Sequence, residues 1–246
     1  MKKQISISII VVVLIVFVMS CRIPPLPPIG NERIKLNDWI CHESQFSQRS
    51  GHVSLLFSNY KYIIGGTANN TAGLNDVWKE FYNTIGNWVT ATASAEFSPR
   101  WGHTGVVFGQ KMWVIGGTPD GVNGLNDVWY SEDGAVWVTD GAEWVTATAS
   151  AAFSGRWGHQ SQSGIDYSIN KYIFVIGGRS QGDYFNDVWS SENGKNWIKQ
   201  NNTNLISRVG FSSIVSGSFL RVFGGYGGSD YYNDECSSYI DTEEYY

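Results

Sequence analysis

The sequence has few cysteines and no excess of positive charge. Its 246 residues include 3 cysteines, and 17 lysines and arginines stand against 22 aspartates and glutamates, which gives a formal net charge of −5. Loss of residues 1–20, which carry two of the lysines, would leave −7. Nucleic acids and anionic membrane surfaces bind clustered lysine and arginine, so this balance disfavours both kinds of partner.

The chain also lacks any segment that requires a helix after residue 30. It is rich instead in glycine and tryptophan, with 28 and 11 residues. That composition indicates many short strands and turns rather than disorder. Roughly 210 residues in this region are enough to bury one sizeable core.

A single long apolar run lies at the N-terminus. Lys2 and Lys3 precede an apolar segment at 5–19, and Ser20 then precedes Cys21. This order is typical of a secretory signal, and it resembles a bacterial lipoprotein signal, in which Cys21 is lipidated and becomes the new N-terminus. The alternative is an uncleaved anchor helix, although the run is shorter than the roughly 20 residues that a spanning helix needs.

Both alternatives predict a domain held at a bacterial cell envelope, outside the cytoplasmic membrane. The proline-rich segment that follows Cys21 is expected to be a stiff tether. We therefore expect a signal peptide at 1–20, a lipidated cysteine and tether at 21–33, and one domain at 34–246.

Four copies of one phrase fill that domain. Each copy reads Arg, one residue, Gly and then His or Phe, an apolar stretch, Gly-Gly, a polar loop and Asn-Asp, and the fourth copy is the most degraded. The Gly-Gly pairs are at 65–66, 116–117, 177–178 and 224–225, and the Asn-Asp pairs at 75–76, 126–127, 186–187 and 233–234. Units of roughly 50 residues cannot bury an apolar face alone, so neighbouring units must stack into one shared core.

Each unit reads as four short strands. In the second unit these are expected at 103–108, at 111–115, at 127–130 and around Trp137. The Gly-Gly pair suits a strand end where the backbone takes a positive φ or passes close to another segment. The segment 87–95 recurs almost unchanged at 143–151, and this duplication is expected to lengthen the outer strand of the second unit or the loop after it.

The Gly-Gly pairs, spaced aromatic residues and four-strand units resemble kelch repeats over residues 34–240. The resemblance implies an all-β fold, a β-propeller of four four-stranded blades. Kelch propellers usually have five to seven blades, so closure of a ring of four is a separate question.

Residues 38–49 match the end of a repeat, whereas the last unit has no second tryptophan before Tyr246. Residues 37–41 are therefore expected to supply the outer strand of the last blade, made by residues 208–240, and to close the ring, which hides two sheet edges. The alternative is an incomplete array whose open edge pairs with another chain. On the shared blade, Cys41 and Cys236 lie on neighbouring strands and are candidates for a disulfide.

Two sets of repeated residues have both a structural and a functional interpretation. The four arginines form either a carboxylate or sialic acid site or one ion pair per unit with the aspartates at 76, 127, 187 and 234; they are Arg49, Arg100, Arg156 and Arg208. His52, His103 and His159, with Phe211 in the fourth place, are expected to bond within their own blades rather than to hold a metal. No metal or other cofactor is predicted.

The polar loops after the Gly-Gly pairs differ between units. The first two are expected to be solvated turns. The last two contain the candidate ligand-binding residues, which are aromatic or arginine side chains on a rigid scaffold. These are Arg179, Tyr184, Tyr226, Tyr231 and Tyr232.

The expected function is a non-catalytic binding or scaffold module for a protein or a glycan. The alternative, implied by the resemblance, is a carbohydrate-active enzyme similar to a sialic acid mutarotase or, less favoured, to the copper-dependent galactose oxidase. Copper chemistry of that type requires a cysteine-modified tyrosine, and after lipidation only Cys41 and Cys236 remain. No catalytic residue is assigned.

Overall fold

The computed structural model describes residues 41–132, 145–166, 169–201 and 204–240. The predicted signal peptide, Cys21, the tether and most of the expected closing segment lie outside these residues. The chain divides into Met1–Cys41 and a compact unit, His42–Tyr246, which contains all four repeats. A search of the described residues finds no helix with the length and apolar character to cross a membrane.

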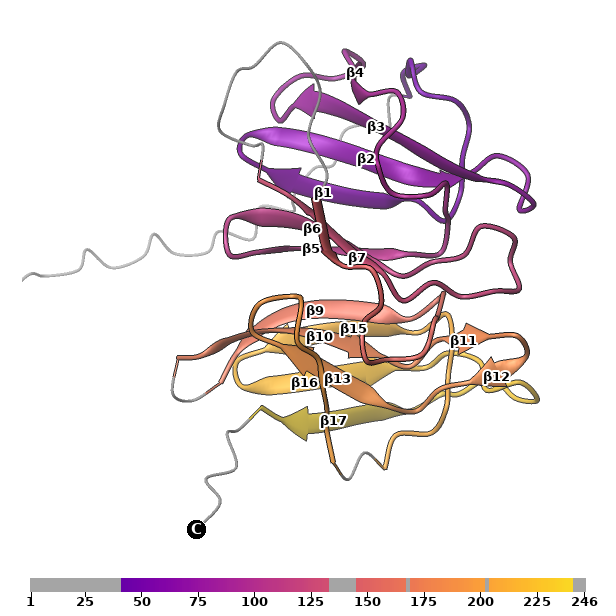
Figure 1. Cartoon of the computed structure of the whole chain (residues 1–246), viewed down its shortest axis with the longest axis vertical. Helices are drawn as coiled ribbons and strands as arrows, with labels where there is room; N and C mark the ends of the chain where they lie inside the picture. Colours follow the sequence, from indigo (N-terminus) through magenta and orange to yellow (C-terminus); the bar gives the residue numbers. More distant parts are fainter. Residues whose placement is uncertain (1–40, 133–144, 167–168, 202–203, 241–246) are drawn as a thin grey trace, which may run out of the picture. The chain divides into compact units, whose positions relative to one another are not determined.

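The described part of the compact unit consists of antiparallel sheets that follow one another in chain order (Figure 1). The first sheet is β1 (Val53–Phe57), β2 (Tyr60–Thr67), β3 (Gly73–Phe81) and β4 (Val89–Thr92). The second is β5 (Thr104–Phe108), β6 (Lys111–Ile115), β7 (Val128–Ser131) and β8 (Val145–Thr148). The third is β9 (Gln160–Ile165), β10 (Lys171–Ile176), β13 (Val188–Ser191) and β14 (Ile198–Lys199).

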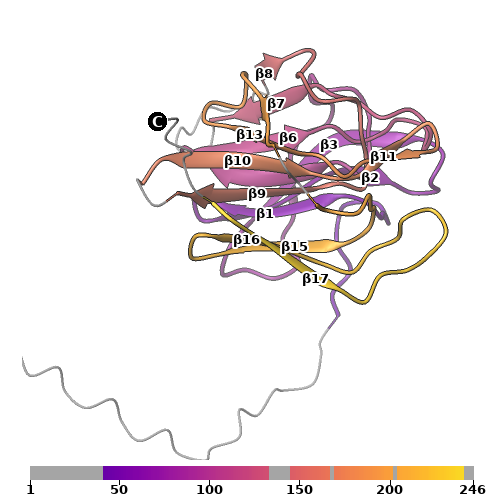
Figure 2. The same cartoon turned by 90° about the horizontal axis from the view of Figure 1, so that it is seen from below.

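The fourth sheet has three described strands, β15 (Ser212–Ser216), β16 (Phe219–Phe223) and β17 (Glu235–Tyr239). A small ribbon, β11 (Arg179–Ser180) with β12 (Asp183–Tyr184), forms the loop after the third Gly-Gly pair. Figures 1 and 2 both place β11 at the end of the sheets opposite the connection between β9 and β10. The all-β architecture expected from the sequence is therefore present, with one sheet per repeat.

The second strand of each unit forms the centre of its sheet because it is almost wholly apolar. Met112, Val114 and Ile115 have no exposed surface, and β6 spans Lys111–Ile115, as predicted. The two glycines that end it have positive φ, +58° at Gly116 and +100° at Gly117. A Cβ on Gly117 would lie 2.7 Å from the Cβ of His103, so glycine is required there for conformation and for space.

The outer strand of the second unit differs from its predicted position. It was expected around Trp137, but β8 is Val145–Thr148, and residues 133–144 lie outside the described residues. The first unit explains the position, because β4 ends eight residues before Arg100 and β8 ends eight residues before Arg156. The duplicated sequence therefore adds residues before the outer strand, and the distance to the next arginine is kept.

Apolar side chains fill the spaces between consecutive sheets. One core cluster joins the first and second sheets around Ile64, Phe97 and Val114. Equivalent clusters join the second to the third sheet and the third to the fourth. The inner strands pack in the same order, β1 with β5, β5 with β9 and β9 with β15.

Closure of this series into a ring is not found among the described residues. Packing comparable to that between the consecutive inner strands does not join β15 to β1 there, and β17 is the edge of its sheet. The segment expected to close the ring, 37–41, lies outside the described residues except for Cys41. The part of the repeat match at 46–49 does hold, since Phe46 packs on Trp78 with ring centroids 6.4 Å apart, as Phe97 does on Trp129.

Candidate interaction surface

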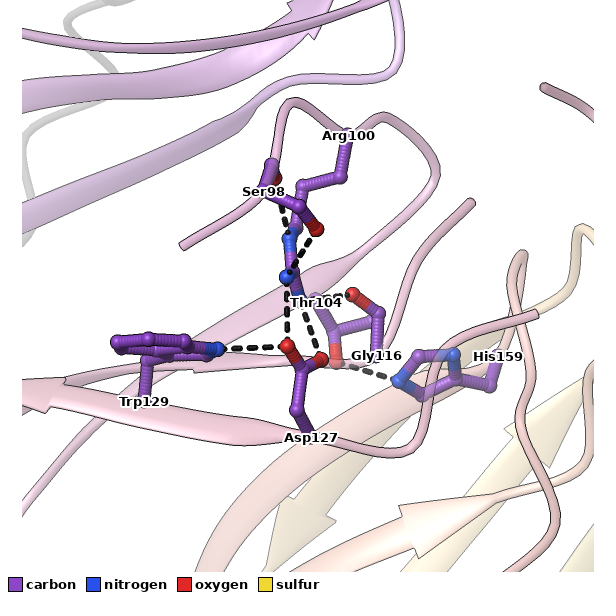
Figure 3. Close-up of polar contacts among 7 residues, drawn as sticks. All are labelled: Ser98, Arg100, Thr104, Gly116, Asp127, Trp129 and His159. Atoms are coloured by element: carbon purple, nitrogen blue, oxygen red, sulfur yellow. Dashed lines mark hydrogen bonds and ion pairs between the residues drawn. The ribbon is translucent and has the colours of Figure 1, made fainter. Parts of the chain in front are cut away.

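The repeated arginines are internal braces. All five N–H groups of Arg100 donate hydrogen bonds, to the two carboxylate oxygens of Asp127 at 2.6 and 2.7 Å, to the carbonyl of Gly116, and to the carbonyl and hydroxyl of Ser98 (Figure 3). The side chain has no exposed surface. The same bidentate pair recurs as Arg49 with Asp76, Arg156 with Asp187 and Arg208 with Asp234.

The structural interpretation of these arginines is therefore the one observed. Because the carboxylate and nearby oxygens occupy the guanidinium donors, the arginines are not presented to an external carboxylate. In the fourth pair, the hydrogen bond from Arg208 lowers the pKa of Asp234 to about 2, against the opposing effect of burial.

His159 bonds to the neighbouring sheet, which differs from its expected partner within its own blade. The Nε2 of His159 is 2.8 Å from the hydroxyl oxygen of Thr104, on β5 of the preceding sheet (Figure 3). The side chain reaches this strand because β5 and β9 pack against each other. Burial, and then the nearby Arg100, lower the pKa of His103 to about 3. Within the described ranges, no cluster of three or more His, Cys, Asp or Glu side chains has a metal-binding arrangement.

The segment after each arginine pairs with the loop after the Gly-Gly of the same unit. The amide of Trp157 donates to the carbonyl of Arg179, and the amide of Arg179 donates back, both at 3.0 Å. Val209 and Tyr226 exchange the same two bonds in the fourth unit. Each loop is thereby fixed to the inner end of its own sheet, so its side chains are presented by a rigid backbone.

These loops place a continuous row of side chains across three units, which we call the aromatic ridge. Its members are Trp101, Trp157, Arg179, Tyr184, Tyr226 and Tyr231. Each contacts the next, with separations between 4.9 and 5.9 Å measured from ring centroids or from the guanidinium carbon. Tyr231 ends the row with 85% of its surface exposed.

Arg179 links the two halves of the ridge. Its guanidinium carbon lies 4.9 Å from the Trp157 ring centroid and 5.1 Å from that of Tyr184, so both contacts are cation–π pairs. Its Nε is shielded from solvent and has no hydrogen-bond partner among the described residues, and the same is true of the indole nitrogens of Trp101 and Trp157.

The structure brings together four of the five loop residues selected from the sequence. Tyr232 is the exception, because its ring lies 4.8 Å from the guanidinium carbon of Arg208 and its hydroxyl donates to the carbonyl of Ser207 at 3.4 Å. It contributes to the arginine brace of the fourth unit rather than to the ridge.

Trp101 and Trp157 were not among the residues selected from the sequence. They occupy the position between the arginine and the glycine of the repeated phrase, where the first and fourth units have Ser50 and Val209. A bulky aromatic residue at this position in two adjacent units was the available signal. Their rings, 5.2 Å apart, come from different sheets, so only the stacking of units brings them together.

The first two loops are polar turns, as expected. The hydroxyl of Thr118 accepts from the amide of Gly121 at 2.8 Å, and a carboxylate oxygen of Asp120 accepts from the amides of Val122 and Asn123. These bonds lower the pKa of Asp120 below its ordinary value, with the side-chain amide of Asn123 as the largest cause. The side chains of this loop are used to hold its own backbone.

Comparison with known proteins finds distant relatives. No protein-family model matches the chain. Over 200 residues, or 76% of the chain, it is 28% identical to Tip elongation aberrant protein 1 of Schizosaccharomyces pombe, a kelch-repeat protein. Over 72 residues, or 29% of the chain, it is 35% identical to tRNA wybutosine-synthesizing protein 2/3/4 of Arabidopsis thaliana.

The matched regions make up only 17% and 7% of those two proteins. The chain therefore corresponds to a small part of each relative. The similarity to a kelch-repeat protein and the series of antiparallel sheets together fit a kelch-like fold.

Proposed function

We propose that the domain is a non-catalytic interaction module and that the aromatic ridge is where its partner binds. The observation that carries this proposal is the continuous contact of Trp101, Trp157, Arg179 and three tyrosines over three repeat units. Tryptophan, tyrosine and arginine are the residues that contribute most often to binding energy at protein interfaces. The kelch-repeat relative supports a role as a scaffold for protein interactions.

Shielded donors on the ridge also support a binding role. Buried polar groups without hydrogen-bond partners are rare in folded proteins. Because such groups cost free energy, they destabilise the unbound domain. The indole nitrogens of Trp101 and Trp157 and the Nε of Arg179 are such groups. An acceptor group of a partner that reaches them after a small side-chain rotation would gain hydrogen bonds that the unbound domain does not make.

A protein partner is favoured over a glycan. Sugars stack on open aromatic faces, whereas the ridge rings lie edge to face or tilted against one another and Arg179 lies against two of them. A carbohydrate-active enzyme has less support, because the repeated arginines and aspartates bind one another.

A photo-crosslinking amino acid at Tyr231 of the full chain tests the proposal. In a native extract it should join the domain to a protein partner, and Trp157→Ala in the same chain should reduce the product at least tenfold, because loss of a central ring costs about 2 kcal/mol. The same crosslinker at Tyr82, which is 53% exposed in the turn after β3, is the control. Equal yields at Tyr231 and Tyr82, or an adduct with glycan alone, would contradict the proposal.

We also propose that Cys21 is lipidated and that the domain is held at a bacterial cell envelope. The support is the order of charged, apolar and small residues at 1–21. Cys21→Ser should move the protein from the detergent phase to the aqueous phase. The precursor should then stay unprocessed and keep its full mass. An unchanged membrane fraction with an unchanged mass would exclude lipidation.

The finer fold assignment belongs to the same proposal. We take the four sheets to be blades of a propeller, and the alternatives for its ends remain closure by residues 37–41 or an open array that pairs with another chain. The chain-order packing of the inner strands supports the blade assignment.

A further inference from the structure

The fourth unit departs from the repeat at the position of a partly buried tryptophan. In the first three units a tryptophan lies two residues after the paired aspartate, and its Nε1 donates to that carboxylate at 2.7 Å in every case, as Figure 3 shows for Trp129 and Asp127. The fourth unit has Cys236 there. The register is the same, since Cys236 lies opposite Val222 on β16 as Trp129 lies opposite Val114 on β6.

The residue that faces this tryptophan is also smaller in the fourth unit. Trp129 packs on Phe97 and Trp189 on Phe153, in both cases with ring centroids 6.4 Å apart. Each phenylalanine lies three residues before an arginine of the repeat, and the residue three before Arg208 is Leu205. A tryptophan–phenylalanine pair is thus replaced by cysteine and leucine between the third and fourth sheets.

A cleft of about 740 Å³ lies at this place. Its apolar walls come from Phe174 on β10, Leu220 and Val222 on β16, Leu205 and Cys236. These walls are buried or partly buried and belong to the core cluster between the two sheets. The volume lies within the range of about 300–1,000 Å³ that is usual for small-molecule sites.

The carboxylate beside Cys236 lacks its strong third donor. In the other units each aspartate accepts two bonds from arginine and one from the indole nitrogen. Asp234 accepts the bonds from Arg208, and the thiol of Cys236 lies 3.6 Å from its Oδ2, which is a weak donor contact. The Asp234 side chain is 32% exposed, against 20%, 18% and 13% in the other pairs.

We propose that this cleft is a binding site for a small planar aromatic molecule that carries an N–H donor. The other three units specify this chemistry, because each fills the same position with an indole ring whose N–H points to the carboxylate. The ring would lie between Phe174, Leu205 and Val222, with its donor directed past Cys236 towards Asp234. The site is separate from the aromatic ridge and does not depend on the function proposed for the ridge.

Calorimetric titration of the full chain with indole tests the proposal, with indene as the probe of the same shape without a donor. Indole should bind, and indene should bind about tenfold more weakly. Cys236→Ala, which gives the donor free access to Asp234, should bind indole at least as tightly as the unmodified protein. Equal affinities for indole and indene would show that the N–H group of the ligand does not contribute to binding, and would overturn its assignment to Asp234.

Cys236→Trp supplies the ring from the chain itself and should abolish indole binding while it raises the melting temperature. Because that variant can misfold, Leu205→Phe, which narrows the cleft from the opposite wall, is the second test and should weaken indole binding at least tenfold. Tyr82→Ala, at an exposed position outside both the ridge and the cleft, is the control and should leave indole affinity unchanged. No indole binding by the unmodified protein, or binding that persists in both cleft-filling variants, would overturn the proposal. A changed oligomeric state in Cys236→Trp would do so as well, since it would show that a second copy occupies the cleft.

Discussion

At the scale of the residue, the repeated ion pairs differ mainly in how well they are shielded. Four arginines have at most 1% of their side chains exposed, and each is paired in the same bidentate geometry. The aspartate partner is 13% exposed in the third unit and 32% exposed in the fourth. A buried charge that loses its partner destabilises a fold far more than a solvated one does.

Asp187→Asn should therefore destabilise the domain by about 3 kcal/mol, because it leaves the Arg156 charge uncompensated in the core. Asp234→Asn is the internal control and should cost about 1 kcal/mol, since water reaches that carboxylate. Urea unfolding followed by tryptophan fluorescence measures both free energies. Equal losses in the two variants would show that shielding does not set the strength of these pairs.

A second residue-scale prediction concerns pH. His103 has a pKa of about 3 in the folded protein, chiefly because it is buried, whereas its unfolded value is about 6.5. Between these values the unfolded chain binds a proton that the folded chain excludes. The free energy of unfolding should thus fall on acidification, by roughly 1 kcal/mol per pH unit for this residue.

His103→Phe should reduce that slope, and the fourth unit shows that phenylalanine fits the position, where Phe211 is 4% exposed. Ser54→Ala, at an exposed position without a titratable side chain, is the control and should leave the slope as it is. Unfolding curves between pH 4 and pH 7 give both slopes. An unchanged slope in His103→Phe would mean that this imidazole does not titrate with unfolding.

At the scale of the element, two glycines at strand ends differ in what a side chain would meet there. Comparing them distinguishes the cost of backbone strain from the cost of a steric clash. Gly117 and Gly109 both have positive φ, +100° and +58°. A Cβ at Gly117 meets the side chain and backbone of His103 at 2.7 and 3.2 Å, whereas a Cβ at Gly109 meets nothing within 4 Å. Both sites therefore carry a conformational cost, and only Gly117 carries a steric cost as well.

Gly109→Ala should cost about 1 kcal/mol, the strain of a left-handed alanine. Gly117→Ala should cost at least 2 kcal/mol more, because β6 must shift away from the segment that carries His103. Thermal unfolding of the two variants measures the difference. Similar melting temperatures would indicate that the segment moves aside without cost.

At the scale of the whole molecule, two cysteines mark the ends of the series of sheets. Cys41 precedes the first sheet in the chain, and Cys236 lies on β17 of the last. Both Cys41 and Cys236 are free thiols in the structure, and Cys236 contacts Arg208 and Asp234 instead of another sulfur. Their pairing under oxidising conditions is the alternative that the sequence predicts. It bears directly on closure, because residues 37–41 were expected to pair with β17.

We expect two titratable thiols in Cys21→Ser protein that is denatured without reduction, which matches the free state of Cys41 and Cys236. Thiol titration with and without prior reduction makes the measurement, and Cys236→Ala should lower the count by one. A titre near zero before reduction would show that the two ends are linked, which the shared blade of the closed-ring alternative makes possible but does not require.

Several features of each unit were predictable because they depend on residues close together in the sequence or repeated at fixed spacing. Strand β6 lies where an apolar run ends at two glycines, and Arg100 pairs with Asp127 because both recur at fixed places in every copy. The candidate ridge was predicted only in part, since four of its six members are in the loops that differ most between units. The position of β8 was missed, because the duplicated segment offers two similar strands and the distance to Arg156 selects one.

The sequence by itself determined the repeat, the all-β class and the strand order within a unit, and it predicted the pairing of arginine with aspartate as one of two alternatives. These follow from backbone conformation and from contacts inside one unit, which every copy encodes again. Only the tertiary structure decided that Trp101 stacks on Trp157, that His159 bonds to Thr104 and that Cys236 and Leu205 face a cleft. Each of these is a contact between neighbouring units, and such contacts depend on how whole sheets pack, which no single copy of the repeat specifies.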